Sequence, residues 1–213
     1  MTLRLDAPTA PNLPLGTNEY QRAYQDGLNN IMRLYFNRID APLQALFNLR
    51  GGRFLNFPYG AIQRTTDATF TANTATQITF DQTDYLNSMT RDPTNGIIVE
   101  YEGIYNYQFS VQLKNADTQI HSAWIWLRVN GTDLAGTGSK FDVVSSHGGT
   151  PGFVIAACNF YVSLQAGDYV EMWAAVDDTN ITFDATAASS SPFAMPAIPS
   201  VVATLSFVSS PPP

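Results

Sequence analysis

The fold is decided by one stretch of alternating residues, Gly103-Ile-Tyr-Asn-Tyr-Gln-Phe-Ser-Val-Gln-Leu113. From Tyr105 to Leu113 every odd position is apolar and every even position is polar. Because the side chains of a strand alternate between its two faces, this stretch predicts a strand that buries one face of an antiparallel sheet and exposes the other to water. No catalytic motif accompanies the pattern, which favours a protein that presents a surface and assembles.

Similar runs of β-branched and aromatic residues follow one another through residues 53–208. Turn residues separate them, as in Asp92-Pro-Thr-Asn-Gly96, Asn130-Gly131 and Ala166-Gly-Asp168. Short strands at this spacing, without intervening helices, predict a sandwich or a barrel. The expected strands cover residues 59–64, 76–80, 96–101, 104–113, 120–130, 139–145, 153–164, 169–176, 180–183 and 201–208.

A helical pattern precedes the strands. Asn18 fits an N-cap, and apolar side chains then recur along one side of a helix over residues 18–40, about 34 Å long at ~1.5 Å per residue. Because Pro42 lacks a backbone N–H, we expect it in the first turn of a second, short helix that ends near Leu49. The apolar stripe consists of Tyr20, Tyr24, Leu28, Ile31, Tyr35 and Ile39.

The chain thus divides into an extended arm over residues 1–16, a helical segment over residues 17–52 and a β-rich head over residues 53–213. The arm has three prolines and no periodicity, which predicts either a segment that a partner orders or a frayed terminus. The helix must cover its stripe, on its own domain or on copies of itself, and the spacing is close to a heptad. Residues 17–52 are therefore a candidate docking and trimerising segment.

Composition limits the partners. The 213 residues allow one sizeable all-β domain plus an appendage. Lys and Arg total 11 against 18 Asp and Glu, and an acidic chain without a basic cluster repels phosphate backbones, so no nucleic-acid partner is expected. No run has the length of a transmembrane helix and the first residues lack a signal-peptide core, so we expect no membrane partner and a cytoplasmic start. Cys158, the only cysteine, fits a small buried hydrophobe better than a reactive thiol.

Three of the expected strands carry apolar side chains on both faces. A strand of a monomeric sandwich needs only one such face, and subunit interfaces are enriched in aromatic side chains. We therefore expect an oligomer to cover the second faces. The alternative is that the connection at residues 67–92 or the N-terminal helix lies over them. The second faces carry Trp124 and Trp126, Tyr169 and Trp173, and Leu205 and Phe207, the last pair opposite Val202 and Val208.

Four motifs of the head follow one another in a distinctive order. They are Gly103-x-Tyr105-x-Tyr107-x-Phe109, Trp126-Leu-Arg-Val-Asn-Gly131, Leu164-Gln-Ala-Gly-Asp-Tyr-Val170 and Met172-Trp173. Residues 57–208 thereby resemble the tumour-necrosis-factor/complement-globular-head jelly roll. The resemblance implies an all-β jelly-roll sandwich of about ten antiparallel strands that forms a homotrimer through aromatic residues of one sheet. The candidate trimer contacts are Tyr105, Tyr107, Trp124, Trp126, Tyr169, Trp173 and Phe207.

The N-terminal segment has a resemblance of its own. Asn12-Leu-Pro-Leu-Gly-Thr-Asn-Glu-Tyr20 and Leu34-Tyr-Phe-Asn-Arg-Ile-Asp40 are similar to the N-terminal segment of virion structural proteins from short-tailed phages of aquatic bacteria, the cyanophages. In those proteins a similar segment stands ahead of different β-rich domains. The resemblance implies a docking module attached to an interchangeable head, in a virion that assembles in the host cytoplasm.

No residue pattern predicts catalysis, a cofactor or a metal site. His121 and His147 lack a second His or a Cys at metal-ligand spacing. Ser145-Ser146-His147 lacks a nucleophile elbow and fits a surface loop better than a triad. Asp177-Asp178 with Asp184 could supply oxygen ligands to calcium, but the pattern of the known calcium loop is absent and solvated turns explain them better. We therefore expect that the protein is not an enzyme.

The function expected from the sequence is that of a homotrimeric bacteriophage virion structural protein. Its N-terminal segment would attach it to other virion proteins, such as major capsid or tail proteins, and the head would face outward as a capsid decoration or cement protein or as a short fibre or knob. The alternative is a tail-associated receptor-binding module whose loops at residues 131–152 and 177–199 recognise a host surface glycan or protein. A hydrolase is the most distant alternative.

Overall fold

The computed structural model describes residues 11–16, 18–47, 57–92 and 96–210. The chain separates into two compact units, Met1–Asn56 and Phe57–Pro213. Residues 1–10 of the expected arm and the expected boundaries after residues 16 and 52 lie outside the described residues. No helix in the described part of the chain combines the length and the hydropathy needed to span a bilayer.

The described part of the first unit contains one continuous helix, α1 (Arg22–Phe47), with Pro42 inside it. The first helical hydrogen bond runs from the Gln25 N–H to the Gln21 carbonyl at 3.1 Å, so the helix begins after Gln21 and the predicted N-cap at Asn18 is wrong. The predicted break before Pro42 is also wrong. Its missing N–H leaves the Arg38 carbonyl without its helical donor, a local loss that the continuous helix tolerates.

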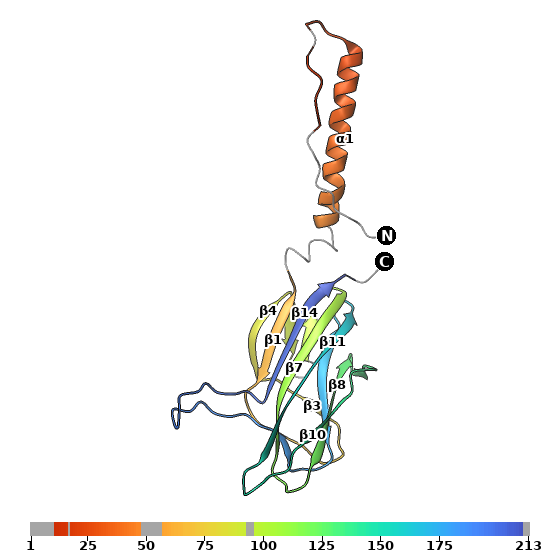
Figure 1. Ribbon diagram of the computed structural model, residues 1–213. Helices are drawn as coiled ribbons and strands as arrows, with labels where there is room; N and C mark the ends of the chain where they lie inside the picture. The colour runs from red at the N-terminus through yellow and green to blue at the C-terminus, as the bar shows by residue number, and fades with distance from the viewer. Residues whose placement is uncertain (1–10, 17, 48–56, 93–95, 211–213) are drawn as a thin grey trace. The chain divides into compact units, whose positions relative to one another are not determined.

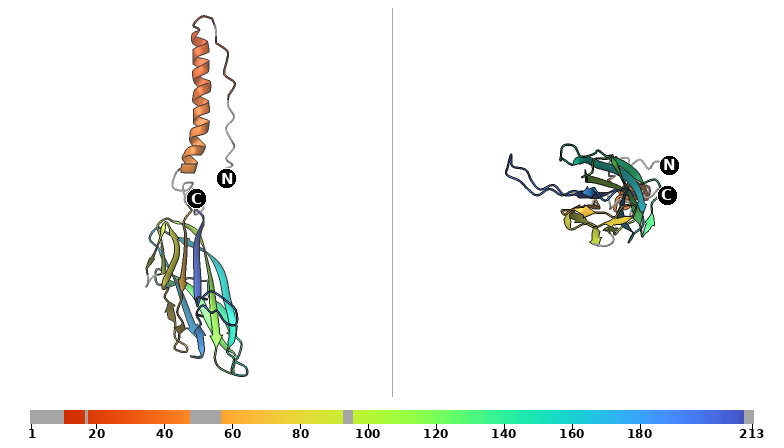
Figure 2. Two further views of the ribbon diagram at one scale, coloured as in Figure 1. Left: turned by 90° about the vertical axis from the view of Figure 1, so that its left-hand side faces the viewer. Right: turned by 90° about the horizontal axis from the view of Figure 1, so that it is seen from below.

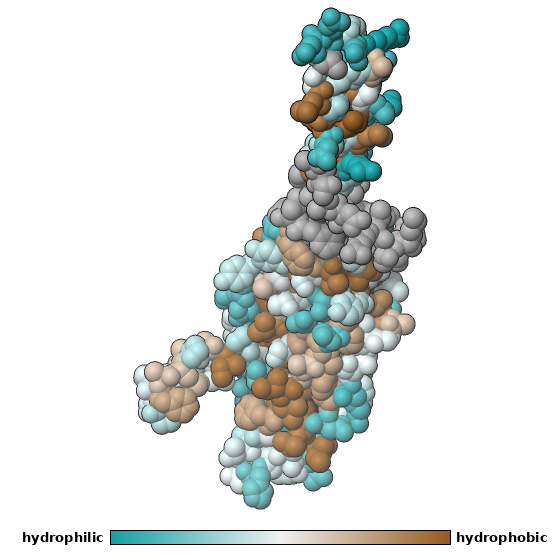
Figure 3. All heavy atoms as spheres, turned by 45° about the horizontal axis from the view of Figure 1, so that its top comes forward, coloured by the Kyte–Doolittle hydropathy of each residue, from teal (hydrophilic) through white to brown (hydrophobic). Residues whose placement is uncertain are grey.

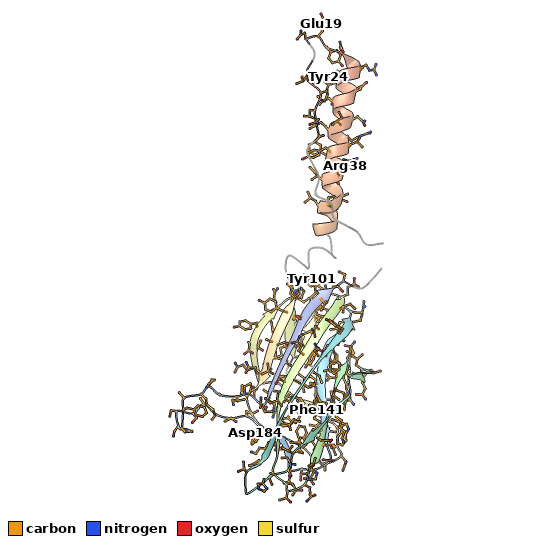
Figure 4. The ribbon with its side chains drawn as sticks, viewed as in Figure 1. Glu19, Tyr24, Arg38, Tyr101, Phe141 and Asp184 are labelled. Atoms are coloured by element: carbon orange, nitrogen blue, oxygen red, sulfur yellow. The ribbon has the colours of Figure 1, made fainter. Side chains whose placement is uncertain are left out.

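The arm residues 11–16 lie alongside this helix (Figure 1). They form neither helix nor strand, and the Tyr24 hydroxyl donates a hydrogen bond to the Pro14 carbonyl at 3.1 Å. Tyr24 points toward the arm in Figure 4. Part of the apolar stripe of α1 is therefore covered by the chain that leads into the helix.

The head is a sandwich of two antiparallel sheets with jelly-roll-like connections (Figures 1 and 2). Sheet A has the order β2-β13-β7-β14-β1-β4, with β11 also paired to β7, and sheet B has the order β10-β8-β12-β6-β5, with β3 on β12 and β9 on β8. Sheet A comprises β1 (Tyr59–Arg64), β2 (Ala68–Thr69), β4 (Gln82–Asn87), β7 (Gly103–Asn115), β11 (Gly152–Leu164), β13 (Ile181–Phe183) and β14 (Val201–Ser209). Sheet B comprises β3 (Thr76–Ile78), β5 (Met89–Asp92), β6 (Gly96–Val99), β8 (His121–Val129), β9 (Thr132–Asp133), β10 (Ser139–Val143) and β12 (Tyr169–Val176).

Strand β7 is the centre of sheet A and confirms the alternation read from the sequence. It pairs with β11 along its whole length, from Gly103↔Leu164 to Asn115↔Gly152, and with β14 on its other side. Its apolar positions are buried between the sheets, whereas its polar positions face outward. The core thus forms where β7, β11 and β14 meet the inward faces of β8 and β12.

The segment at residues 67–92, of which only residues 76–80 were expected as a strand, forms strands in both sheets. Strand β4 pairs with β1 at the edge of sheet A, and β5 pairs with β6 in sheet B. The sequence of β4, Gln-Thr-Asp-Tyr-Leu-Asn, is mostly polar because an edge strand exposes much of both faces, and so it lacks an alternating pattern. These residues extend the sheets and do not lie over the second faces of other strands.

Residues 185–199, here called the ribbon, connect β13 to β14 and project away from the sandwich (Figures 1 and 2). Two pairs of backbone hydrogen bonds hold its two halves together, one between Thr186 and Ile198 at 2.8 and 2.9 Å and one between Ser189 and Met195 at 2.9 and 3.1 Å. The ribbon is therefore an ordered two-stranded extension of the head.

Candidate functional site

Three of the predicted trimer contacts belong to the core. Tyr105, Tyr107 and Phe207 are at most 1% exposed within the single chain. The rings of Tyr105 and Phe207 lie 5.6 Å apart in an edge arrangement, and the Tyr105 hydroxyl donates to the Tyr101 carbonyl at 2.7 Å. Burial raises the pKa of the Tyr107 phenol. This corrects the expectation for these rings, because they point between the sheets and offer no surface to a second chain.

Phe207 was misplaced because the wrong face of β14 was predicted to point outward. Leu205 and Phe207 were expected on the second face of this strand, opposite Val202 and Val208. They are instead on the inward face, in register with Tyr107 and Tyr105 of β7. Both faces of β14 contain apolar residues, so the sequence alone did not determine which face was inward.

The other four predicted contacts lie on the outward face of sheet B. Trp124 is 37% exposed and Trp126, Tyr169 and Trp173 are partly buried. Charged side chains of the same sheet cover the indoles: the Arg128 guanidinium carbon lies 3.7 Å from the Trp173 ring centroid and the Lys140 ammonium 5.7 Å from that of Trp124. Cations stacked on rings keep this face wetted and charged.

A network of polar groups accompanies the tryptophans. The Trp126 N–H donates to Asp133 Oδ1 at 2.7 Å, and Arg128 pairs with the same oxygen at 2.5 Å. Glu171 is directly opposite Arg128 in the register but accepts its hydrogen bond from Gln77 at 2.8 Å. The outward face of sheet B is therefore aromatic and charged at once.

The outward face of β11, β7 and β14, here called the A face, has a different chemistry. Phe153, Ile155 and Tyr161 of β11 are 53%, 65% and 71% exposed. Of the described residues on this face, only Lys114 at one end is charged, and its ammonium donates to Asp184 Oδ1 at 2.7 Å. Between the apolar side chains lies a hollow of about 520 Å³ whose outward lining is Gln108, Ser110, Ala157, Asn159, Val202 and Thr204.

The A face was not among the predicted sites. The expected strand at residues 153–164 has apolar residues on both faces, and its sequence pattern does not tell the two faces apart. The structure separates them: Ala156, Val162 and Leu164 are buried, whereas Phe153, Ile155 and Tyr161 point outward. A count of the outward positions along this run would have given the missing signal.

His121 is surrounded by three carboxylates. Its Nε2 lies 2.8 Å from Asp117 and 3.9 Å from Asp178, and its Nδ1 lies 3.4 Å from Asp177. The hydrogen bond to Asp117, supported by the charges of the other two carboxylates, raises the pKa of His121, and the same bond lowers the pKa of Asp117. The cluster ties the loop before β8 to the loop after β12.

The residues considered for chemistry do not come together as a site. The Ser146 N–H donates to the Asp117 carbonyl at 2.7 Å, and His147 is in an exposed turn closed by backbone bonds with Thr150. Asp184 pairs with Lys114 and is not part of the His121 cluster. In the described part of the chain no group of three or more His, Cys, Asp or Glu side chains is arranged to hold a metal ion.

The predicted docking stripe lies on one side of α1. Tyr24, Leu28, Ile31, Tyr35 and Ile39 are half-buried, whereas Tyr20 precedes the helix and is exposed. Further apolar side chains that flank the stripe remain exposed, namely Leu34, Phe36 and Leu43. The apolar surface of this unit is thus wider than the part that is covered within the unit.

Comparison with known proteins gives matches among solved structures alone. No family model matches the chain, and no curated protein matches it. Among solved structures, the globular domain of zebrafish complement 1qA protein has a TM-score of 0.43 and 12% sequence identity, covering 73% of this chain and 99% of that chain. The jelly-roll-like architecture of the head is established by its own strand pairing, and the phage-like resemblance of residues 12–40 remains a prediction.

Proposed function

We propose that this chain is a bacteriophage virion structural protein that forms a homotrimer through its head and attaches to the particle through residues 17–52. In the virion the head acts as a capsid decoration or cement protein or as a short fibre or knob. The resemblance of the N-terminal segment to phage virion proteins supports the virion role. The chemistry of the A face supports the assembly.

The observation that carries the proposal is the combination of apolar exposure and missing charge on the A face. Phe153, Ile155 and Tyr161 expose large side chains on a strand whose outward neighbours are Ala157, Asn159 and residues of β7 and β14, of which only Lys114 is charged, and it is paired with Asp184. Depletion of charged residues around aromatic ones distinguishes the centre of a subunit interface from ordinary surface. Burial of this face against a second copy removes these apolar groups from water.

The mechanism is binding without chemistry. Three heads held together carry three N-terminal segments, so each attachment to the particle raises the effective concentration of the next. The exposed apolar flanks of α1, at Leu34, Phe36 and Leu43, are the surface that a capsid or tail protein would cover. Assembly and attachment thus use separate surfaces.

The test of assembly is the mass of the full-length protein in solution, measured by analytical ultracentrifugation over a range of concentrations. We expect three times the 23.3 kDa of one chain. Ile155→Asp places an uncompensated charge on the A face and should raise the dissociation constant at least about 100-fold, because an unpaired charge in an interface costs several kcal/mol.

Thr90→Asp is the matched control, since Thr90 is an exposed residue of β5 in sheet B. It should leave the trimer mass unchanged. A monomer at every concentration, or equal effects of the two substitutions, contradicts assembly through the A face.

The test of attachment uses the flanks of α1. Replacing Leu34, Phe36 and Leu43 together by Ser should leave the trimer intact and remove the protein from purified virions, measured by quantitative mass spectrometry. Normal incorporation of this variant would contradict docking through α1.

A second candidate function, recognition of a host glycan, is favoured by one observation on sheet B. Trp124 is exposed beside Lys140, and an indole face flanked by a cation and by Asp142 suits stacking on a sugar ring. Binding of the full-length protein to a glycan array that Trp124→Ala abolishes would support this role. If the protein binds no glycan on the array, the recognition role is contradicted and only the structural role remains.

A further inference from the structure

The ribbon has an unusual composition for a segment that projects into solvent. From residue 185 to the end of the chain there is no charged residue. Phe193 at the tip is 65% exposed, and Ile198 near the root is also exposed. Figure 3 shows the ribbon in pale and tan colours, without the dark teal of charged side chains. Solvent-facing hairpins usually carry charge, because charge prevents unwanted pairing.

The ribbon is ordered without a core of its own. Its halves are joined by backbone hydrogen bonds at Thr186–Ile198 and Ser189–Met195, and the Ser189 hydroxyl donates to the Ser191 carbonyl at 2.7 Å. An isolated two-stranded hairpin is marginal in water, since it buries little apolar surface. An ordered, uncharged and apolar-tipped ribbon is suited to lie on another surface.

The root of the ribbon adjoins the A face. Thr186 and Ile198 line a hollow of about 390 Å³ together with Phe153 and Ile155 of β11. Asp184, which pairs with Lys114, marks the point where the chain leaves the sandwich (Figure 4). From there the ribbon leads away from its own head in two perpendicular views (Figures 1 and 2), so it does not cover its own A face.

We propose that the ribbon clasps a second copy of this chain, lying on the A face of that copy with Phe193 in the hollow beside Ala157 and Asn159. The inference rests on the proposed homotrimer and adds to it an exchanged arm. Eight residues separate Ala185 from Phe193 and reach about 26 Å at ~3.3 Å per residue, which is enough to cross to a neighbouring sandwich.

The low charge of both the ribbon and the A face favours a second copy of this chain as the partner. Moving an uncharged ribbon from water onto a protein surface costs little free energy only if that surface also lacks unpaired charge, because a buried unpaired charge is costly. The A face meets this condition apart from Lys114 at its end, which Asp184 neutralises, whereas the outward face of sheet B carries Arg128, Lys140 and Asp142. Three copies in which each ribbon reaches the next form a closed ring of identical contacts.

The test is disulfide trapping in the full-length chain. In a Cys158→Ser background, Asn159→Cys and Phe193→Cys are placed in separate chains that are co-expressed and then oxidised. We expect a covalent dimer of the two chains on a non-reducing gel. The control replaces Asn159→Cys with Thr90→Cys on sheet B and should give no covalent dimer above background.

A deletion provides an independent measurement. Residues 187–197 are replaced by Asn-Gly, which closes a two-residue hairpin between the bonded pair Thr186 and Ile198. The circular dichroism spectrum of the head should be unchanged, while the dissociation constant of the trimer rises at least about tenfold. Phe193→Ser should give a smaller rise, and Phe193→Leu and the equally exposed Ile120→Ser should give none.

The outcomes separate the two proposals. A trimer that is unchanged by the deletion and gives no trapped dimer overturns the clasp and leaves the proposed homotrimer standing. A monomer at every concentration overturns both, since no second copy is then present for the ribbon to hold. Trapping together with weakened assembly supports the clasp.

Discussion

The A face carries a single charged side chain at its edge, whereas the outward face of sheet B combines Trp124, Trp126 and Trp173 with Arg128 and Glu171. Both faces expose aromatic side chains. On sheet B, however, cations stack on the rings and hydrogen bonds hold the polar groups, while on the A face the apolar side chains have no charged cover.

This difference shows that aromatic content is a poor guide to an interface. The tryptophans are conspicuous in the sequence, but side chains of their own sheet already contact them. Exposed apolar side chains in a charge-poor setting are the stronger indicator. Ile155 is therefore a better candidate contact than Trp173.

The largest expected effect tests the premise that Tyr105, Tyr107 and Phe207 of sheet A lie inside the sandwich. Phe207→Ala should lower the free energy of unfolding by about 3–5 kcal/mol, because it leaves a cavity against Tyr105. The measurement is urea unfolding at one fixed protein concentration. Val208→Ala on the outward side of the same strand should cost less than about 1 kcal/mol. Equal costs would show that the two sides of β14 are not distinguished as described.

A smaller effect is expected on sheet B. Arg128→Ala removes the stack on Trp173 and the pair with Asp133, and should lower the free energy of unfolding by about 1 kcal/mol. Arg128→Lys keeps the charge but loses the planar stack, so it should recover only part of this loss. The loss of stability in Arg128→Ala should be smaller at high salt, because Asp133 is exposed and salt screens its attraction to Arg128. An Arg128→Ala variant as stable as the wild type would mean that the cations do not support the tryptophan face.

The smallest effect concerns pH and the His121 cluster. The pKa of His121 is raised in the folded chain, so its contribution is fully present below about 6.5 and is lost as the pH rises through the raised value. The pKa values of Asp117 and Asp178 are lowered, so their contribution is present above about 3.8 and is lost as the pH falls through the lowered values. The melting temperature should therefore decline as the pH rises above about 6.5.

Melting curves of His121→Gln provide the check, because this variant should show a flatter dependence over the same range. His147→Gln, in an exposed turn, should keep the slope of the wild type. A slope that is unchanged in His121→Gln would assign the pH dependence to other groups.

Much of the fold was readable from local pattern. Strands β1 and β12 have the predicted bounds, and β7, β8 and β11 differ only at their ends. The alternation of residue types along the sequence predicted these strands, because each strand has one face in the core. Strand β4 was missed because its polar edge position gives no alternation, and the break at Pro42 was wrongly predicted because a single missing hydrogen bond does not end a helix that continues on both sides.

The sequence by itself determined the class of the head and its central strand, because a strand with one apolar and one polar face has one energetically acceptable orientation. Only the tertiary structure decided which face of β11 and β14 points outward, since both faces of each carry apolar residues and only the packing of the opposite sheet distinguishes them. The same holds for the ribbon and the A face. Their chemistry depends on residues far apart in the chain, and strand pairing alone brings those residues together.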